Sequence, residues 1–329
     1  MKKVEFGILV LFLFLIIFCP FFLNQVRVRL MTEVIYFGLF AVSLNLILGY
    51  GGLLSFGHSA YFGLGAYVTA LALLHIKGLD LISVVLLGGL AAALVGSFFS
   101  LFLIRVSGTY FAMLTMAFGQ LLYAVALKWR SVTRGDDGIG NFPRPDLHIP
   151  LLGRVDMMDA SNFYWFTLAI VGAMVFFAWY IITRTSLGIS IILLRENEER
   201  ARFLGHRTSL TRFWLFTFSS FLAGISGSLF GIFQELVTAT SIDILRSTDP
   251  ILMVVIGGMR HFWGPLLGTL VYVVAGDWLS GITVRWEFII GCFFIVLVLF
   301  LRGGLISLIL DLENRFMKII GVNAKEPLP

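Results

Sequence analysis

The stretch GYGGLLSFGHSAYFGLGAY, residues 49–67, sets a cluster of glycines and one histidine between two long apolar runs. Each run is close to the roughly 20 apolar residues that a helix needs to cross a bilayer. Glycine inside a helix costs about 1 kcal/mol relative to alanine. We therefore predict that one membrane helix ends at Gly51 and Gly52, near the cytoplasmic face, and that a second helix begins just beyond them.

The composition places the whole chain in a membrane. Of its 329 residues, 59% are hydrophobic and 13% are charged, whereas soluble domains have roughly 45–50% apolar and about 25% charged residues. So little polar surface cannot cover so large a core in water, which excludes a soluble globular domain. The sequence predicts an all-α polytopic membrane protein in which residues 1–329 form a single transmembrane domain.

Apolar segments recur about ten times along the chain, and we predict that each is a transmembrane or half-membrane helix. Segment 250–259 is unusually short, because ten residues of helix span only about 15 Å, half of a hydrocarbon core. It is expected to be a buried half-helix or part of a re-entrant hairpin. The predicted segments are 4–23, 32–49, 57–76, 81–104, 109–127, 163–183, 213–236, 250–259, 264–279 and 286–301.

The basic residues indicate how these segments are oriented. Arginine and lysine are more frequent near the termini and in loop 184–212 than on the other side, and such residues favour the cytoplasm. We therefore expect both termini, loop 184–212 and the tail 303–329 to be cytoplasmic, and loop 128–162 to be extracytoplasmic. The net charge of +5 fits this role and does not predict nucleic-acid binding. Cys19 and Cys292 lie in apolar runs, which predicts neither a disulfide nor a metal site.

Five stretches, in this order along the chain, resemble a known family. They are SLNLILGYGGLLSFGHSAYFGLGAY (43–67), GTYFAMLTMAFGQLLYAVALKW (108–129), TRGDDGIGNFPRP (133–145), LRENEERARFLG (194–205) and ILMVVIGGMRHFWGPLLGTL (251–270). Together they resemble the LivM-type permease subunits of branched-chain amino acid ABC importers, in the LivH/LivM permease family. The resemblance covers most of the chain.

The resemblance implies a role and a set of partners. Such subunits have the type II-like ABC importer permease fold, lie in the bacterial inner membrane and pair with a second, LivH-type permease. Two cytoplasmic ABC ATPase subunits bind beneath the pair, and a periplasmic binding protein delivers leucine, isoleucine or valine. The sequence contains no G-x-x-x-x-G-K-[ST] phosphate loop. We therefore expect a non-catalytic permease that binds no cofactor, with Mg-ATP held by the partner subunits.

Loop 184–212 carries the coupling motif that the resemblance implies. ABC importer permeases present a helix with an E-A-A-x-x-x-G pattern to the ATPase. Glu199, Ala201 and Gly205 match this pattern, whereas Arg200 replaces its first alanine. The loop is therefore expected to dock on an ATPase, although the contacts at the replaced position differ from those of the family.

The residues of this loop predict one short helix over 195–205. Ala201 and Leu204 lie on its apolar side, and Gly205 follows it as a C-cap. A plain surface helix that only connects two spans is the alternative interpretation. The residues expected to couple the chain to the ATPase are Arg195, Glu198, Glu199, Ala201, Arg202 and Gly205.

Polar residues within the apolar segments are the expected pathway residues, because they are costly in a membrane unless they face protein or water. Branched-chain amino acids are zwitterions with apolar side chains, so hydroxyls, amides and apolar walls suit their passage. A strong fixed charge at mid-membrane depth would trap the zwitterion, and we expect none there. The candidates for the pathway are Asn45, Gly51, Gly52, Ser55, His58, Ser59, Thr109, Thr115, Gln120, Gly257 and Gly258.

The same residues have a structural interpretation. Serine and threonine in membrane helices often bond to their own backbone or hold helices together, and small residues let helices approach closely. We expect Gly57, Gly63 and Gly65 to serve close packing, and His58 to form a helix–helix hydrogen bond rather than to relay protons. The carboxylates near the outer ends of their segments, where solvent or a binding protein reaches them, are Glu235, Asp277 and Glu287.

The sequence contains a weak internal repeat. GYGGLLSFG (49–57) and IGGMRHFWG (256–264) each contain a glycine pair followed four residues later by phenylalanine. Each is expected at the cytoplasmic end of a span, which allows a duplicated half.

Two further functions fit the same composition. Permeases of importers for urea, amides or other amino acids are closely similar, and ion-coupled transporters or channels also use glycine-broken helices. No hydrolase motif of the H-E-x-x-H, G-x-S-x-G or G-x-G-D type occurs in the sequence.

Overall fold

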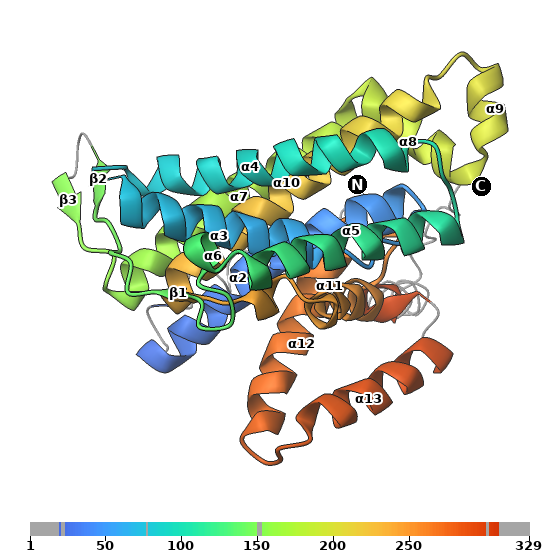
Figure 1. Ribbon diagram of the computed structural model, residues 1–329. Coiled ribbons are helices and arrows are strands. Elements are labelled where there is room, and N and C mark those ends of the chain that lie inside the picture. The colour runs from blue at the N-terminus through green and yellow to red at the C-terminus, as the bar shows by residue number, and fades with distance from the viewer. Residues whose placement is uncertain (1–19, 21–23, 77, 150–152, 301–302, 309–329) are drawn as a thin grey trace.

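The computed structural model describes residues 20, 24–76, 78–149, 153–300 and 303–308, which form a largely helical bundle (Figure 1). Five described helices are long and apolar enough to cross a membrane, namely α2 with the π-helical turn η1 (Gln25–Tyr50), α4 (Leu81–Leu103), α5 (Thr109–Lys128), α7 (Ala160–Arg184) and α10 (Thr208–Gln234). The shorter helices are α3 (Ser59–His75), α6 (Arg130–Thr133), α8 (Ser186–Glu196), α9 (Glu198–Phe203), α11 (Ile244–Gly257), α12 (Gly264–Ser280) and α13 (Trp286–Phe300).

The predicted segments from 32–49 onward each overlap one of these helices. Nearly all of segment 4–23 and most of the tail 303–329 lie outside the described residues. The mostly helical class is therefore confirmed, while the number of about ten crossings stays a prediction.

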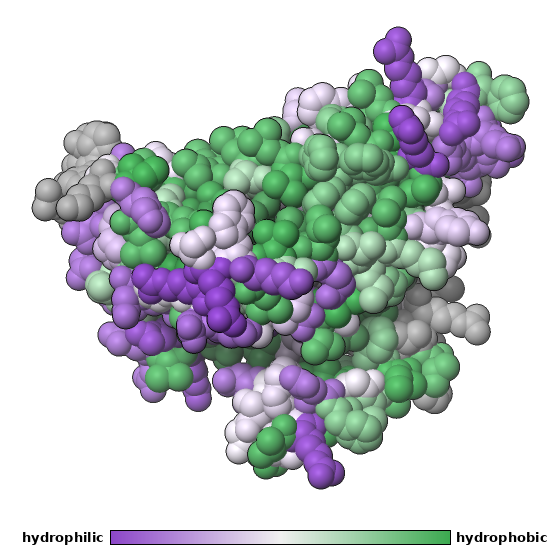
Figure 2. All heavy atoms as spheres, in the orientation of Figure 1, coloured by the Kyte–Doolittle hydropathy of each residue, from purple (hydrophilic) through white to green (hydrophobic). Residues whose placement is uncertain are grey.

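Helices α2 and α10 form the centre of the bundle. In the most apolar 18-residue stretches of α2 and α10, 83% and 78% of the residues are buried. The corresponding fractions in α4, α5 and α7 are 28–39%. The three outer helices expose large apolar side chains such as Leu94, Tyr110 and Phe176. Figure 2 shows apolar residues over the upper middle of this face, with hydrophilic residues at its left and upper-right ends and in a band that runs inward from the left. This distribution fits outer helices that face lipid.

Small residues bring α3, α4 and α10 into close contact. Helix α10 packs most extensively against α4 and α3. A Cβ on Gly65 would collide with the backbone of Gly224, and one on Gly57 would meet the carbonyl of Thr115. A Cβ on Gly63 would likewise collide with the side chain of Ile242. The predicted role of these three α3-side glycines in close packing is confirmed.

The two long loops lie at opposite ends of the bundle (Figure 1). At one end, β1 (Ile139–Gly140) pairs antiparallel with β4 (Leu236–Val237), and β2 (Leu147–Ile149) pairs with β3 (Gly153–Val155). Helices α8 and α9 lie at the other end. We call these the ribbon end and the α9 end. Their separation is what the predicted topology requires of loops 128–162 and 184–212.

The predicted break at Gly51 and Gly52 is present, and it contacts a second glycine break at Gly258, in the repeated stretch. Gly52 (φ +67°) follows η1, and Gly258 (φ +115°) follows α11; both φ values lie where glycine is favoured. The Asn45 side-chain amide donates to the carbonyl of His261 at 3.5 Å. A side chain on Gly49 would collide with the carbonyl of Met259. The repeat in the sequence thus corresponds to two helix–break–helix units packed together.

Helix α11 begins at Ile244, before the predicted segment 250–259, which corrects that boundary. Asp243 caps its start by accepting a hydrogen bond from the N–H of Ile244 (2.6 Å). The helix continues through Pro250, which lacks the N–H that would otherwise donate to the carbonyl of Arg246. Its 14 residues span about 21 Å, less than the roughly 30 Å of a hydrocarbon core. The helix is longer than predicted but too short to cross the core alone, and the choice between a half-helix and a re-entrant hairpin stays a prediction.

Candidate functional site

The polar groups of residues 51–59, which we call the glycine junction, are bonded in part: Ser59 is fully bonded, whereas Ser55 Oγ and His58 Nδ1 are buried without a hydrogen-bond partner among the described residues. The Ser59 hydroxyl lies 2.9 and 2.8 Å from the carbonyl oxygens of Ile242 and Asp243. The Ser59 N–H donates to Ser247 Oγ (3.0 Å), and the Ser247 hydroxyl donates back to Ser59 Oγ (2.6 Å). These bonds hold the start of α3 against the start of α11.

His58 occupies a fully buried site in this junction. Its Nε2 lies 2.9 Å from Ser43 Oγ and 3.5 Å from Ser219 Oγ, which belong to α2 and α10. Its ring stacks on Phe40 with centroids 5.7 Å apart and an interplanar angle of 7°. The imidazole therefore links three parts of the chain, which is the helix–helix bonding expected of it.

The other predicted pathway residues are scattered through the packed bundle. Asn45, Ser55 and Thr115 are buried, and Thr115 Oγ1 accepts a hydrogen bond from the N–H of Phe56 (3.3 Å). Thr109 is exposed at the α9 end, and Gln120 is half-buried. Gly51, Gly52, Gly257 and Gly258 form the two helix breaks. Their role in transport stays a prediction.

A large cavity lies between α2, α10, α11, α12 and α13, and we call it the charged cavity. Its volume of about 810 Å³ falls within the range of roughly 300–1,000 Å³ typical of small-molecule sites. None of the predicted pathway residues lines it. The polar residues that line it include Glu33, Gln234, Arg246, Asp249, Tyr272 and Asp277.

Arg246 and Asp249 are the ion pair of this cavity. Arg246 Nη1 donates to Asp249 Oδ2 at 3.0 Å, and the Tyr272 hydroxyl donates to Asp249 Oδ1 at 2.7 Å. The Arg246 guanidinium carbon lies 4.7 Å from the ring centroid of Phe37 and 5.4 Å from that of Phe230. Both distances are within cation–π range, so two aromatic rings hold the charge in place.

This ion pair places fixed charges beside the middle of α2, while the expectation of none at mid-membrane depth stays a prediction. Phe37, which lies against Arg246, is the thirteenth of the 26 residues in Gln25–Tyr50. The assignment of Arg246 and Asp249 to a loop before Pro250 was wrong, because they lie in the first turns of α11. The signal in the sequence was Asp243, a favourable N-cap residue, followed by arginine and aspartate at i,i+3 spacing.

A second cavity of about 390 Å³, the outer cavity, lies at the ribbon end. It shares Glu33 and Gln234 with the charged cavity. Arg29, Arg144 and Glu235 also line it. The two cavities therefore meet where α2 passes the end of α10, and charged groups of both signs lie along both of them.

Arg144 fixes loop 128–162 to the end of α10. Its Nη2 donates to the carbonyl of Ile232 (2.8 Å) and lies 3.1 Å from a carboxylate oxygen of Glu235. Its guanidinium carbon lies 4.7 Å from the centroid of the Phe163 ring. Burial lowers the pKa of the Arg144 guanidinium, and the Glu235 carboxylate partly offsets this effect. A cation at the carbonyl end of a helix is favourable, so this contact stabilises the ribbon end.

At the opposite end, the predicted single helix over 195–205 is two helices, which is a correction. Asn197 separates α8 from α9 with an extended backbone (φ −162°, ψ 107°). Its side-chain oxygen accepts a hydrogen bond from the N–H of Arg200 at 2.9 Å, so it caps α9. Arg195 thus belongs to α8, where its side chain lies against Gly52 of the glycine junction.

Gly205 ends α9 as predicted. Its φ is +84°, and its N–H donates to the carbonyl of Arg202 (2.9 Å). The next N–H, of His206, donates to the carbonyl of Ala201 (3.0 Å). These two bonds form a Schellman motif, in which glycine is favoured because of its positive φ.

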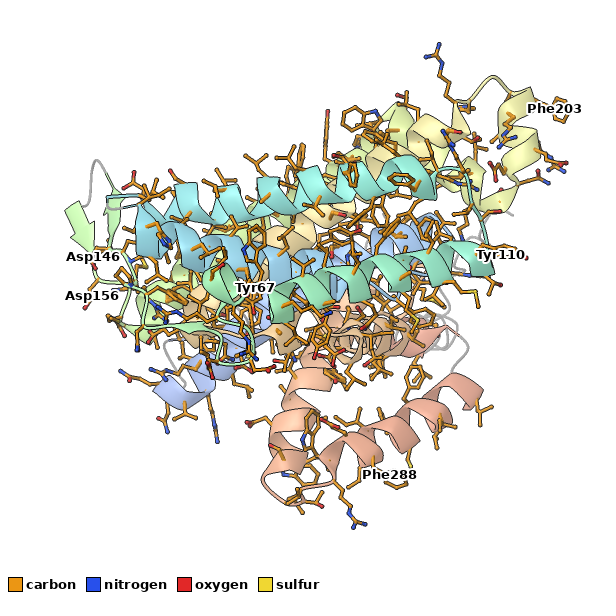
Figure 3. All side chains as sticks on the ribbon, in the orientation of Figure 1. Tyr67, Tyr110, Asp146, Asp156, Phe203 and Phe288 are labelled. Atoms are coloured by element: carbon orange, nitrogen blue, oxygen red, sulfur yellow. The ribbon has the colours of Figure 1, made fainter. Side chains whose placement is uncertain are left out.

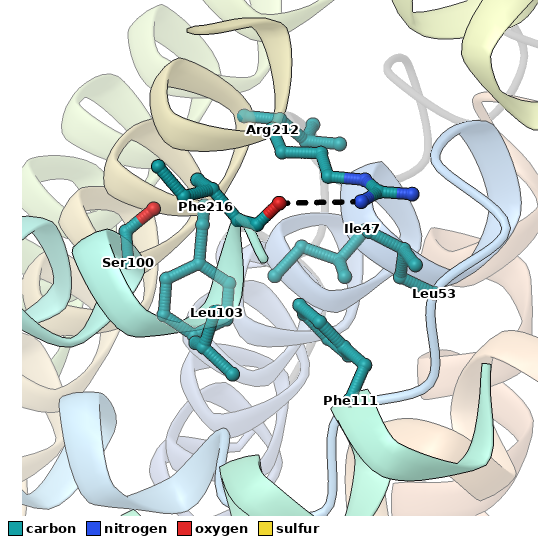
Figure 4. Close-up of a pocket in the computed structure, with 9 residues that line it drawn as sticks. Ile47, Leu53, Ser100, Leu103, Phe111, Arg212 and Phe216 are labelled. Carbon is teal, nitrogen blue, oxygen red and sulfur yellow. Dashed lines mark hydrogen bonds between the residues drawn. The ribbon is translucent and has the colours of Figure 1, made fainter. Parts of the chain in front are cut away.

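Glu198 and Arg212 connect α9 to the bundle. The Glu198 carboxylate pairs with the buried Arg212 of α10 (2.5 Å) and with Arg202 (2.7 Å). Arg212 Nη1 also donates to the carbonyl of Ile104 at the end of α4 (3.4 Å), as Figure 4 shows. This guanidinium borders a narrow, mostly apolar gap that is too small for water. These contacts connect α9 directly to α10 and, through Arg212, to the end of α4.

The outer surface of α9 carries apolar side chains that the sequence interpretation did not single out. Phe203 is 90% exposed and Leu204 is 64% exposed, although Leu204 was predicted to lie on the buried side. Figure 3 shows Phe203 projecting away from the bundle. Ala201 is the buried residue of this helix, and Glu199 is exposed. An exposed aromatic ring among charged residues is typical of a protein interface.

Residues 26–310 match the family described as "branched-chain amino acid transport system / permease component". The chain belongs to this family. As a member of it, the protein is a transport permease, and its apolar helices are those of a membrane protein. No enzymatic family is indicated, since the relatives are named as permease proteins.

Curated relatives agree with this family. The chain is 26% identical over 317 residues to the high-affinity branched-chain amino acid transport system permease protein LivM of Escherichia coli strain K12, covering 91% of this chain and 74% of the relative. The Salmonella typhimurium LivM is 26% identical over 306 residues, covering 88% and 72%. A probable LivH permease of Methanocaldococcus jannaschii is 32% identical over 90 residues, 27% of this chain and 28% of the relative. No solved structure matches the chain significantly.

Proposed function

We propose that this permease is a membrane-spanning subunit of an ATP-driven importer of leucine, isoleucine and valine. A periplasmic binding protein delivers the amino acid, and separate ATPase subunits drive alternating access. Membership of the branched-chain permease family and the LivM names of the relatives support this proposal. The absence of a phosphate loop from the sequence is consistent with ATP hydrolysis on another chain.

The observation that carries the coupling role is the geometry of α9. This short helix projects at the end opposite the ribbons and exposes Phe203 and Leu204. Glu198 joins it to Arg212 of the central helix α10. Closure of an ATPase against α9 would be transmitted to α10 as a rigid-body movement. The side chain of Arg195 lies against Gly52, so a movement of α8 would also reach the glycine junction. The helix break in this junction is proposed to move during transport.

The proposed function also implies where the protein lies and which partners it binds. The chain lies in the bacterial inner membrane with both termini, the α9 end and the tail in the cytoplasm. Loop 128–162 faces the binding protein. A second, LivH-type permease completes the pathway, and two ABC ATPase subunits bind at the α9 end. The whole chain acts as one permease domain.

The substitution Gly205→Asp tests the coupling role. Gly205 has open space around it within this chain, so an added side chain meets nothing except a docked partner. We expect normal membrane insertion and loss of ATP-driven leucine uptake in proteoliposomes that contain the assembled transporter. Backbone strain from the positive φ costs only about 1–2 kcal/mol.

Gly78→Asp is the matched control. Gly78 has nearly the same φ (+82° against +84°) and equally open surroundings. It lies between α3 and α4 at the ribbon end, where no ATPase docks. Normal uptake by both variants would reject the docking of α9, whereas equal loss in both would show strain alone.

A further inference from the structure

Arg246 has binding capacity that the protein does not use. A guanidinium carries five N–H donors, and among the described residues its only hydrogen bond goes to Asp249. The rings of Phe37 and Phe230 lie within cation–π distance of it, and Arg246 lines the cavity, where its remaining N–H groups have no hydrogen-bond partner among the described residues. Such a guanidinium is suited to bind a carboxylate through two parallel hydrogen bonds.

Unpaired carboxylates lie across the same cavity. Glu33 of α2 has no hydrogen bond or ion pair among the described residues, although Arg246 and Asp277 are near enough to interact with it electrostatically. Asp277 is exposed near the end of α12. Charges within membrane segments are expensive and mark functional positions. Here a cation and an anion face one space from different helices.

The rest of the cavity is apolar. Leu252, Met253 and Val273 line it together with the rings of Phe37 and Phe230. A ligand that matches this surface has one negative and one positive group close together and an aliphatic side chain. A free branched-chain amino acid has this arrangement, whereas urea has neither charge and an inorganic cation has no carboxylate.

We propose that the charged cavity is an amino-acid subsite in which Arg246 binds the α-carboxylate and Glu33 binds the α-ammonium group. This inference rests on the proposed function and adds a transient binding site within the membrane to it. Asp249 and Tyr272 are positioning residues, because both carboxylate oxygens of Asp249 are occupied and hold the guanidinium in place. The aliphatic side chain of the ligand lies against Leu252, Met253 and Val273.

Binding to the assembled transporter in lipid nanodiscs, without its binding protein, tests the subsite. The probes are leucine, leucinamide, which lacks the carboxylate, and 4-methylpentanoate, which lacks the ammonium group. We expect leucine to bind at least tenfold more tightly than either analogue. Equal affinities for all three, or no binding of leucine, would overturn the proposal, for example because the second permease fills the cavity.

Two substitutions separate the two ends of the ligand. Arg246→Gln should weaken leucine binding about tenfold and abolish the preference over leucinamide, while preserving the preference over 4-methylpentanoate. Glu33→Gln should abolish only the preference over 4-methylpentanoate. Arg246→Lys retains the positive charge and should restore part of the discrimination against leucinamide. A purely structural role for these residues would lower the affinity for all three probes equally.

Arg27→Gln is the matched control for these variants. Arg27 belongs to the same helix as Glu33, is exposed and lines neither cavity. Its substitution should leave all three affinities unchanged. Uptake by the unmodified transporter, with its binding protein and ATP, is measured in parallel. Absence of leucine uptake would reject the proposed function itself, whereas uptake without discrimination in the nanodisc assay would reject only the subsite.

Discussion

The glycine junction and the charged cavity both place polar groups inside an apolar bundle, but they treat those groups differently. In the junction, Ser59 and His58 are fully buried and bonded to neighbouring helices. In the cavity, Arg246 and Glu33 are only partly buried and retain unused hydrogen-bonding capacity. The difference indicates that the bonds of Ser59 and His58 serve packing and that the cavity is available to a ligand. Substitutions on the two sides should therefore affect different properties.

The largest expected effect on stability is that of Gly57→Leu in the junction. A Cβ here would collide with the carbonyl oxygen of Thr115, which belongs to the backbone and cannot relieve the clash by changing rotamer. We expect a loss of about 3 kcal/mol or more of unfolding free energy, seen as a lower thermal midpoint in detergent. Gly172→Leu on the open side of α7 is the control, since a Cβ there meets nothing within 4 Å. An unchanged midpoint for Gly57→Leu would show that the junction is loosely packed.

An intermediate effect is expected for Ser59→Ala. Removal of the hydroxyl leaves the carbonyls of Ile242 and Asp243 without this donor and Ser247 without its acceptor. Unsatisfied buried groups cost about 1–3 kcal/mol, so the thermal midpoint should fall while uptake per folded transporter is retained. Ser97→Ala, which removes an exposed hydroxyl bonded within its own helix, should change neither. Loss of uptake at an unchanged midpoint would instead make Ser59 a pathway residue.

The smallest effect on stability, with a large effect on transport, is expected for Gly291→Leu. Gly291 lines the charged cavity, and an added Cβ meets nothing within 4 Å. The free energy of unfolding should change by no more than about 0.5 kcal/mol, so the thermal midpoint should hardly shift. Leucine uptake should fall because the side chain occupies the cavity. Gly172→Leu again provides the control and should transport normally. Normal uptake by Gly291→Leu would place the pathway elsewhere.

Much of the architecture was predictable from local sequence. Long apolar runs predicted the helices, because a bilayer requires about 20 apolar residues per crossing. The first glycine pair predicted the break at Gly52, and the weak repeat marked the equivalent position at Gly258, since a positive φ is inexpensive only for glycine. Gly205 predicted the end of α9 for the same reason. Each of these features depends on residues that are neighbours in the chain.

The candidate site was only partly predictable. The E-A-A-like motif located the coupling loop but not the break at Asn197 or the exposure of Phe203. The polar residues in the stretches that resemble the family predicted a pathway at the glycine junction. Arg246 and Asp249 were instead assigned to a loop before Pro250. Local composition cannot tell whether a polar group will be bonded by a distant helix.

The sequence by itself determined the membrane class, the family and the positions at which helices end, because hydrophobicity and backbone preference act locally. Only the tertiary structure decided which polar groups are satisfied and which face open space. Glu33, Arg246 and Tyr272 come from helices that are far apart in the chain, and they meet only when α2, α11 and α12 pack around one cavity. The cavity exists because α12 and α13 leave space beside the central helices, which no local pattern specifies.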